Sequence, residues 1–185
     1  MPVNDLKQSG PSGLILTGTA GDDYLKGASG GDSLSGGDGN DMLCGGGGAD
    51  TLDGGAGNDT LVGGRGADVL TGGSGSDTFL ISGKVTATQD GLDRITDFTH
   101  GEDRLGFGGQ MSLAGHSFWS GSAATYGDAV AAATQQITSG AADLVAVQVG
   151  TDVIVFADSS LHNHVDAAVV LVGQTLAGIS QWDVF

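Results

Sequence analysis

The chain is poor in the residues that cross-link, anchor or attract polyanions in other proteins. Its 185 residues include one cysteine, two prolines and six lysines or arginines against 22 acidic residues, for a formal net charge of −16 at pH 7. A single cysteine excludes an internal disulfide. Nucleic-acid binding requires clusters of Lys and Arg, so DNA and RNA are not expected partners. The longest apolar runs, such as 167–172, are too short to span a bilayer.

Motifs of several catalytic classes are missing as well. No H-E-x-x-H occurs, which removes the zinc-protease signature. The segment GHSFW at 115–119 is similar to the lipase elbow G-x-S-x-G, but Trp119 stands where the final glycine is needed. Cys44 has no base partner that would make it a nucleophile, and we expect an unpaired surface thiol. The sequence therefore predicts a protein that is not an enzyme.

A group of possible transition-metal ligands lies near the C-terminus. His162, His164 and Asp166 have donor atoms of the right type. Such a cluster is more often an exposed loop, and that is the preferred interpretation here.

The chain does contain a nine-residue unit that is repeated seven times without a break over residues 18–80. The copies are GTAGDDYLK, GASGGDSLS, GGDGNDMLC, GGGGADTLD, GGAGNDTLV, GGRGADVLT and GGSGSDTFL. The first six positions are small, glycine-rich and end in Asp, which predicts a tight loop. The last three positions read polar, apolar, polar and predict a three-residue strand with one inward side chain. The inward side chains are Leu25, Leu34, Leu43, Leu52, Leu61, Leu70 and Phe79, and the sixth-position carboxylates are Asp23, Asp32, Asp41, Asp50, Asp59, Asp68 and Asp77.

Apolar side chains alone cannot hold this repeat together. One buried Leu or Phe per nine residues has to offset the backbone entropy of a glycine-rich segment, and it is too little. Stacked carboxylates add electrostatic repulsion. A hard cation reverses both effects, because Ca²⁺ takes about six to eight oxygen ligands, including carboxylates and backbone carbonyls. The repeat therefore predicts a fold that requires calcium.

The pattern G-G-x-G-x-D-x-U-x, with U apolar, resembles the calcium-binding nonapeptide of the RTX family of bacterial secreted proteins. The resemblance implies an all-β, right-handed parallel β-roll (a β-solenoid) in which two nonapeptides make one turn, followed by a mostly β cap with one helix. It places ions between loops two repeats apart, in about five complete Ca²⁺ sites. The expected aspartate pairs are Asp23/Asp41, Asp41/Asp59, Asp59/Asp77, Asp32/Asp50 and Asp50/Asp68.

Carbonyls of the loop glycines complete each shell in what the resemblance implies. The glycines expected to contribute are Gly36, Gly39, Gly45, Gly48, Gly54, Gly57, Gly63, Gly66, Gly72 and Gly75. Thr19 and Ala28 replace the second glycine in the first two copies. We therefore expect strained loops and the least secure ions at the N-terminal end.

Segments on either side of the repeats continue the period weakly. Residues 1–17 form a lead-in, flexible over 1–13, with a partial repeat in which Leu16 precedes Leu25 by nine residues. Residues 81–110 hold two degenerate repeats, and DRITDF followed by GEDRL resembles the segment that closes the rolls of serralysin-type and alginate-epimerase proteins. Their candidate ligands for end sites, which could instead be solvated acidic turns, are Asp90, Asp93, Asp97 and Asp103.

Residues 111–185 have the signals of an ordinary fold and resemble the cap of serralysin-type proteins. A helix is predicted over 126–139, with Asp128 capping its start and Gly140 its end. Residues 144–149 and 153–156 are predicted to form a hairpin, and 165–172 a further strand. We expect Phe118, Trp119 and Trp182 to pack in this cap.

These observations favour a non-catalytic calcium-binding module that folds in extracellular Ca²⁺ and supports type I secretion from a Gram-negative bacterium. Residues 1–13 are polar and lack the apolar segment of a signal peptide. Residues 181–185, QWDVF, resemble the uncleaved terminal motif that a type I exporter reads, although they could instead complete the core of the cap. Two alternatives remain: a module that binds polysaccharide or a cell surface, and the C-terminal part of a larger secreted protease, lipase or epimerase.

Overall fold

Strands alternate between two sheets over residues 4–107. The computed structural model describes residues 4–7, 13–82, 91–107, 118–158, 164–180 and 183–184. Helices in these residues include α1 (Tyr126–Thr138) and the 3₁₀ helix η2 (Leu176–Gly178), and none has the length and apolar character needed to cross a membrane. The strands are β1 (Asn4–Lys7), β2 (Ile15–Thr17), β3 (Asp23–Lys26), β4 (Ser33–Asp38), β5 (Met42–Gly47), β6 (Thr51–Ala56), β7 (Thr60–Arg65), β8 (Val69–Ser74), β9 (Thr78–Ile81), β10 (Asp93–Ile95), β11 (Arg104–Phe107), β12 (Phe118–Ala123), β13 (Leu144–Val149), β14 (Asp152–Ala157) and β15 (Ala167–Leu171).

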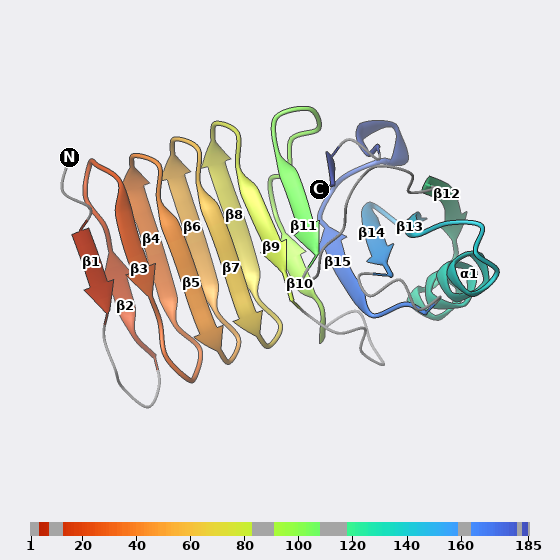
Figure 1. Ribbon diagram of the computed structural model, residues 1–185, viewed down its shortest axis with the longest axis horizontal. Coiled ribbons are helices and arrows are strands. Elements are labelled where there is room, and N and C mark those ends of the chain that lie inside the picture. The colour runs from red at the N-terminus through yellow and green to blue at the C-terminus, as the bar shows by residue number, and fades with distance from the viewer. Residues whose placement is uncertain are drawn as a thin grey trace.

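The repeats form a parallel β-roll, as predicted. One sheet has the order β1-β3-β5-β7-β9-β11, and the other runs β12-β13-β14-β15-β10-β8-β6-β4-β2. Each strand of the roll pairs in parallel with the strand two further along the chain, and Leu25 lies opposite Leu43, one turn of two nonapeptides later. Figure 1 shows these strands stacked in chain order from the N-terminal end to β10 and β11.

The apolar ladder predicted from the eighth repeat position is the core of the roll. Its seven side chains are at most 1% exposed. Ile95 lies opposite Leu70 and Leu105 lies opposite Phe79, so the two degenerate repeats extend the ladder by one residue on each sheet. Leu16 starts it, opposite Leu34.

The strands are longer than the predicted three residues. In the middle of the roll each has six, because pairing continues into the first three positions of the next copy, where Gly37 lies opposite Gly55. Residues 4–7 are also a strand rather than part of a flexible lead-in: β1 pairs with β3, and Leu6 lies opposite Leu25. Leu6 precedes Leu16 by ten residues instead of nine, so the period does not reveal it.

The cap continues one sheet of the roll. β15 pairs in parallel with β10, with Val170 opposite Arg94, and is followed by antiparallel β14 and β13. The predicted hairpin and last strand are therefore present. Helix α1 covers this sheet through Ala129, Ala133 and Ile137, which form a second apolar core with residues of β13, β14 and β15.

The start of the helix differs from the prediction. Thr125, not Asp128, is the N-cap, and its Oγ1 accepts from the backbone N–H of Asp128 at 3.2 Å. Asp128 is three residues further on, where its carboxylate accepts from the same hydroxyl. Gly140 follows the helix at φ +69°, as expected of a C-terminal glycine. Phe118 packs against the roll core and Trp119 against the cap core, while Trp182 lies outside the described residues.

Candidate metal sites

The sixth-position aspartates form two buried ladders inside the loops of the roll. Each of the seven side chains is at most 3% exposed, and Asp93 and Asp103 of the degenerate repeats are buried with them. The strand of each copy begins directly after this aspartate, or at it in β3, so the carboxylate lies where the loop meets the sheet. Burial of so many carboxylates is unfavourable unless each is paired.

Hydrogen bonds along the roll join each aspartate to the one in the next coil, where a coil is one turn of the roll, made of two nonapeptides. The backbone N–H of Asp41 donates to Asp59 Oδ1 at 2.7 Å, and that of Asp59 donates to Asp77 Oδ1 at 2.9 Å. The same bond, at 2.7–3.1 Å, occurs in Asp23/Asp41, Asp32/Asp50, Asp50/Asp68, Asp68/Asp93 and Asp77/Asp103. All five pairs expected from the sequence are therefore neighbours.

In most of these aspartates the second carboxylate oxygen is buried but accepts no hydrogen bond. Within the described part of the chain, seven buried carboxylate oxygens accept no hydrogen bond: Asp23 Oδ1 and the Oδ2 atoms of Asp41, Asp50, Asp59, Asp68, Asp77 and Asp93. Leaving a buried acceptor unsatisfied costs about 1–3 kcal/mol, and more when the group is charged. Six of these atoms are Oδ2 oxygens at equivalent positions of successive copies, and a repeated set of this kind indicates a common partner.

Burial sets the protonation of these groups in the absence of a cation. Desolvation is the main reason that the pKa of Asp59 rises to about 6 and that of Asp93 to about 7, and neighbouring aspartates add to it. The same desolvation raises the pKa of Asp41, Asp50, Asp68, Asp77 and Asp103. Burial therefore disfavours the charged form of these carboxylates unless a cation lies beside them.

The first-position glycines leave small spaces beside the aspartate Oδ2 atoms. We call such a space a glycine cradle where a carboxylate oxygen and a carbonyl oxygen both line it. A Cβ on Gly36 would collide with Asp41 Oδ2 and with the carbonyl oxygen of Gly54 in the next coil. The space that a side chain would fill thus lies between a carboxylate and a carbonyl. The same arrangement occurs at Gly18, Gly27, Gly45 and Gly54. At Gly63 the three nearest atoms all belong to Asp68, and at Gly72 they belong to Asp77 and Phe79.

The two N-terminal cradles differ from the other three. Asp23 Oδ2 accepts from the backbone N–H of Thr19 at 2.5 Å, and Asp32 Oδ2 accepts from that of Ala28 at 2.8 Å. Copies three to seven have glycine at this second position, with φ between 99° and 111°, a region that side chains with a Cβ rarely adopt. Their Oδ2 atoms are the unsatisfied ones, so the two substitutions change the donor set at the N-terminal end.

Oxygen donors of this kind fit calcium. No group of three or more His, Cys, Asp or Glu side chains able to hold a metal occurs among the described residues, so backbone carbonyls have to supply the rest of each shell. Hard carboxylate and carbonyl oxygens in flexible number are the ligands that Ca²⁺ accepts, while Mg²⁺ demands a rigid octahedron.

The fourth-position glycines, expected as carbonyl donors, have a stacking role as well. Their φ values run from 125° to 137° for Gly39, Gly48, Gly57, Gly66 and Gly75. A Cβ on Gly57 would collide with the backbone of Gly39 in the preceding coil. Positive-φ glycines that the sequence prediction did not include lie at the second position of the same loops: Gly37, Gly46, Gly55, Gly64 and Gly73. Their signal is the repeat itself, since all five late copies carry glycine there.

The other candidates contribute differently. Asp97 accepts from the backbone N–H groups of Gly72 at 2.9 Å and Gly73 at 2.8 Å, so its carboxylate ends the roll by pairing exposed backbone donors. Burial raises the pKa of the half-buried Cys44 thiol, which opposes reactivity. His164 is exposed. Asp90, His162 and residues 115–117 of the elbow-like segment lie outside the described residues.

Comparison with known proteins agrees with this geometry. A protein-family profile described as the RTX calcium-binding nonapeptide repeat matches residues 17–52 and 45–79. No curated protein matches the chain. Among solved structures, the R3 subunit of the AlgE6 mannuronan C5-epimerase of Azotobacter vinelandii is similar over the whole chain and 84% of its own, with 23% identity and a TM-score of 0.53.

Two further structures are similar at lower TM-scores. The R2 subunit of the same epimerase has 24% identity over 93% of this chain and 92% of its own, with a TM-score of 0.36. The extracellular lipase LipA of Serratia marcescens has 18% identity over 97% of this chain and 40% of its own, with a TM-score of 0.35. Taken with the buried aspartate ladders and glycine cradles, the profile match identifies residues 17–79 as RTX calcium-binding nonapeptide repeats.

Proposed function

We propose that this chain is a non-catalytic module that folds when it binds Ca²⁺ outside the cell and that supports type I secretion. The main supporting observation is the row of buried Oδ2 atoms that have no hydrogen-bond donor; those of Asp41, Asp50 and Asp59 face the glycine cradles. Calcium would be held by the aspartate pairs and first-position carbonyls, with about five sites from the five cradles. The match to the RTX calcium-binding nonapeptide repeat supports the calcium-binding part of this proposal.

The difference in calcium concentration between the cytosol and the outside of the cell would control folding. Weak extracellular calcium sites have dissociation constants of roughly 10⁻⁴–10⁻³ M. Such sites stay empty at the much lower calcium of the cytosol, where the carboxylates repel one another and one Leu per repeat does not offset the entropy of the glycine loops. The chain would remain extended inside the cell and fold outside it.

A calcium titration of the purified chain, followed by circular dichroism and calorimetry, tests this proposal. We expect EGTA to remove most β structure of the roll and calcium to restore it cooperatively, with magnesium substituting poorly. An unchanged spectrum across the chelator titration would contradict the proposal.

The export part of the proposal concerns residues 183–185. In the folded chain Asp183 is 2% exposed and Val184 is 1% exposed, with Val184 bridged to Leu105 in the roll core. An exporter would therefore have to engage this end before folding. Deletion of 183–185 is expected to abolish secretion by a type I exporter while the purified protein still binds calcium in the middle of the roll. Secretion at the level of the intact chain would exclude this end as the signal.

The alternatives make distinct experimental predictions. A polysaccharide-binding module would retain alginate or another glycan in calcium and release it in EGTA. The outward repeat positions offer only Lys26 and Arg65 as cations, which disfavours tight binding of a polyanion.

A further inference from the structure

The last coil of the roll depends on a loop that continues the aspartate ladder. We call residues 98–103 the closing loop; it turns through Gly101, whose φ is +80°. The backbone N–H of Asp77 donates to Asp103 Oδ1 at 2.9 Å, and that of Thr99 donates to Asp103 Oδ2 at 2.7 Å. Asp77 Oδ2 is one of the unsatisfied oxygens. The shape of the closing loop therefore decides how Asp103 faces Asp77.

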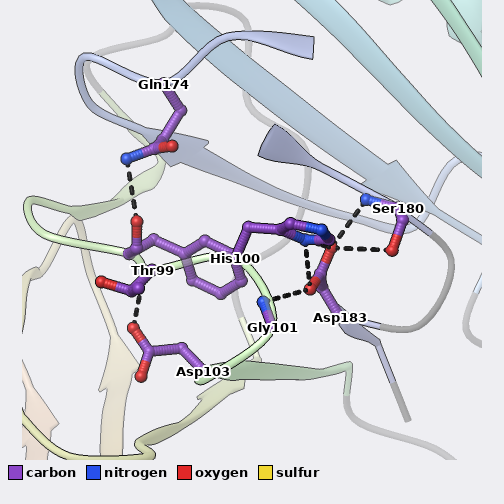
Figure 2. A network of polar contacts seen from close by, with 8 residues as sticks. Thr99, His100, Gly101, Asp103, Gln174, Ser180 and Asp183 are labelled. Carbon is purple, nitrogen blue, oxygen red and sulfur yellow. Dashed lines mark hydrogen bonds and ion pairs between the residues drawn. The ribbon is translucent and has the colours of Figure 1, made fainter. Parts of the chain in front are cut away.

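The closing loop is held by a buried carboxylate from the far end of the chain. His100 Nδ1 lies 2.9 Å from both oxygens of Asp183, and the backbone N–H of Gly101 donates to Asp183 Oδ1 at 3.3 Å. Asp183 Oδ2 also accepts from Ser180, from its N–H at 2.6 Å and its hydroxyl at 3.1 Å. Figure 2 shows Asp183 between Ser180 and the His100–Gly101 pair. Two chain segments some 80 positions apart thus share one carboxylate.

Neighbouring contacts fix the same loop from other sides. Gln174 Nε2 donates to the carbonyl oxygen of Phe98 at 2.8 Å, and the Gln174 carbonyl accepts from Gln148 of the cap at 3.1 Å. Val184, next to Asp183, bridges to Leu105 just after the loop. The closing loop, Ser180 and Asp183 together line a cavity of about 290 Å³.

We propose that Asp183 is a positioning residue for an end site of the roll, between Asp77 and Asp103, that lies beyond the five glycine cradles. It holds the closing loop in the shape that places Asp103 opposite Asp77, so docking of the C-terminus and cation binding in the last coil strengthen each other. The inference rests on the proposed calcium-dependent folding and adds a residue outside the repeats to it. An undocked closing loop has to be ordered at the moment of cation binding, at an entropic cost that Asp183 removes in advance.

The geometry of a solenoid predicts where the effect is felt. Each coil contacts only its neighbours, so a change at the last coil acts most strongly there and weakens toward the N-terminus. A general loss of stability would instead shift all coils together. This gradient separates a positioning role from a merely structural one.

The test compares variants of the full chain by hydrogen exchange at increasing free calcium. In Asp183→Asn, the calcium midpoint for protection of 99–107 is expected to rise about 5-fold or more, and that of 51–65 by less than about 2-fold. Glu102→Gln is the matched control, because it removes one negative charge from an exposed side chain of the same loop, and it is expected to leave both midpoints near those of the parent chain. His100→Ala, which keeps the Ser180 and Gly101 contacts, is expected to give a smaller shift in the same segment, and the double variant to be no worse than Asp183→Asn.

Each outcome decides the inference. If the parent chain gains no protection with calcium, the proposed function fails and the inference with it. If the parent chain responds but Asp183→Asn shifts neither segment, or shifts both equally, the inference alone is overturned. Should Asp183→Asn not fold at any calcium concentration, His100→Ala decides: a shift confined to 99–107 supports the positioning role, and its absence excludes it.

Discussion

The roll and the cap share a nine-stranded sheet but are stabilised in different ways. Each repeat of the roll buries one Leu or Phe together with one carboxylate. In the cap, five consecutive residues of β14 (153–157) and all of β15 are buried, and α1 covers the sheet with Ala and Ile. The cap thus has a continuous apolar core, whereas the roll has unsatisfied carboxylate oxygens along its length. We therefore expect folding of the roll, but not of the cap, to require a cation.

Removal of calcium by a chelator should give the largest difference in stability between the roll and the cap. In EGTA we expect amides of β4–β8 to exchange rapidly while those of β13, β14 and α1 stay protected, because only the roll loses its counter-charge. Hydrogen exchange with mass spectrometry resolves the two sets. Equal loss of protection in both would mean that the cap has no stability of its own.

The core of the roll should be as sensitive as its ligands. Leu52→Asp places a charge in the apolar ladder, at a position with no exposed surface, and is expected to cost several kcal/mol and prevent folding even at saturating calcium. Thr51→Asp, one residue away on the outward face, is the control and should fold. Circular dichroism at high calcium distinguishes the two. A folded Leu52→Asp would show that metal binding alone determines the roll.

Aspartates in the middle of the roll should matter more than those at its N-terminal end. Asp59 Oδ2 has no donor, whereas Asp23 Oδ2 already accepts from Thr19. Loss of a charged contact of about 1.5–3 kcal/mol corresponds to roughly 10-fold or more in binding. Asp59→Ala is therefore expected to raise the calcium midpoint about 10-fold, and Asp23→Ala much less. Calorimetric titrations of both variants measure this, and equal shifts would contradict the stacked arrangement.

The sequence predicts the periodic part of the molecule well because every contact there is repeated. A spacing of nine fixes which Leu and which Asp lie in register, and the structure has those neighbours in place. Contacts made once are not periodic. β1 has a ten-residue spacing, and β12 (FWSGSA) mixes aromatic with small polar residues and gives no alternation. The role of Asp97 as an acceptor for Gly72 and Gly73, and that of Asp183, depend on segments that meet only after folding.

Acidity should partly replace calcium in the roll. In the metal-free fold the pKa values of Asp59 and Asp93 are raised to about 6 and 7, so the neutral carboxyls stabilise that fold. This contribution is complete below the ordinary value of 3.8 and is lost as the pH rises through about 6 to 7. In EGTA we expect more β structure at pH 4 to 5 than at pH 8, and in calcium we expect the apparent affinity to increase with pH up to about 7. Circular dichroism across this pH range is the measurement, and β structure in EGTA that does not fall with rising pH would contradict the assignment.

The smallest expected effect concerns an asparagine ladder that is present on one loop edge of the roll and absent from the other. Loops leading into β5, β7 and β9 carry a ladder of exposed side chains at the fifth repeat position: Asn40 Oδ1 accepts from the N–H of Asn58, and Asn58 Oδ1 accepts from that of Ser76, both at 2.8 Å. The opposite edge has Ala49 and Ala67 at this position and cannot form such bonds. Asn58→Ala is expected to lower the free energy of unfolding in saturating calcium by about 0.5–1.5 kcal/mol. Ala49→Ser is the control on the other edge and should change it less, as urea denaturation would show. A larger loss from Asn58→Ala than from Asp59→Ala would mean that side-chain ladders, rather than the cation, carry the stability of that edge.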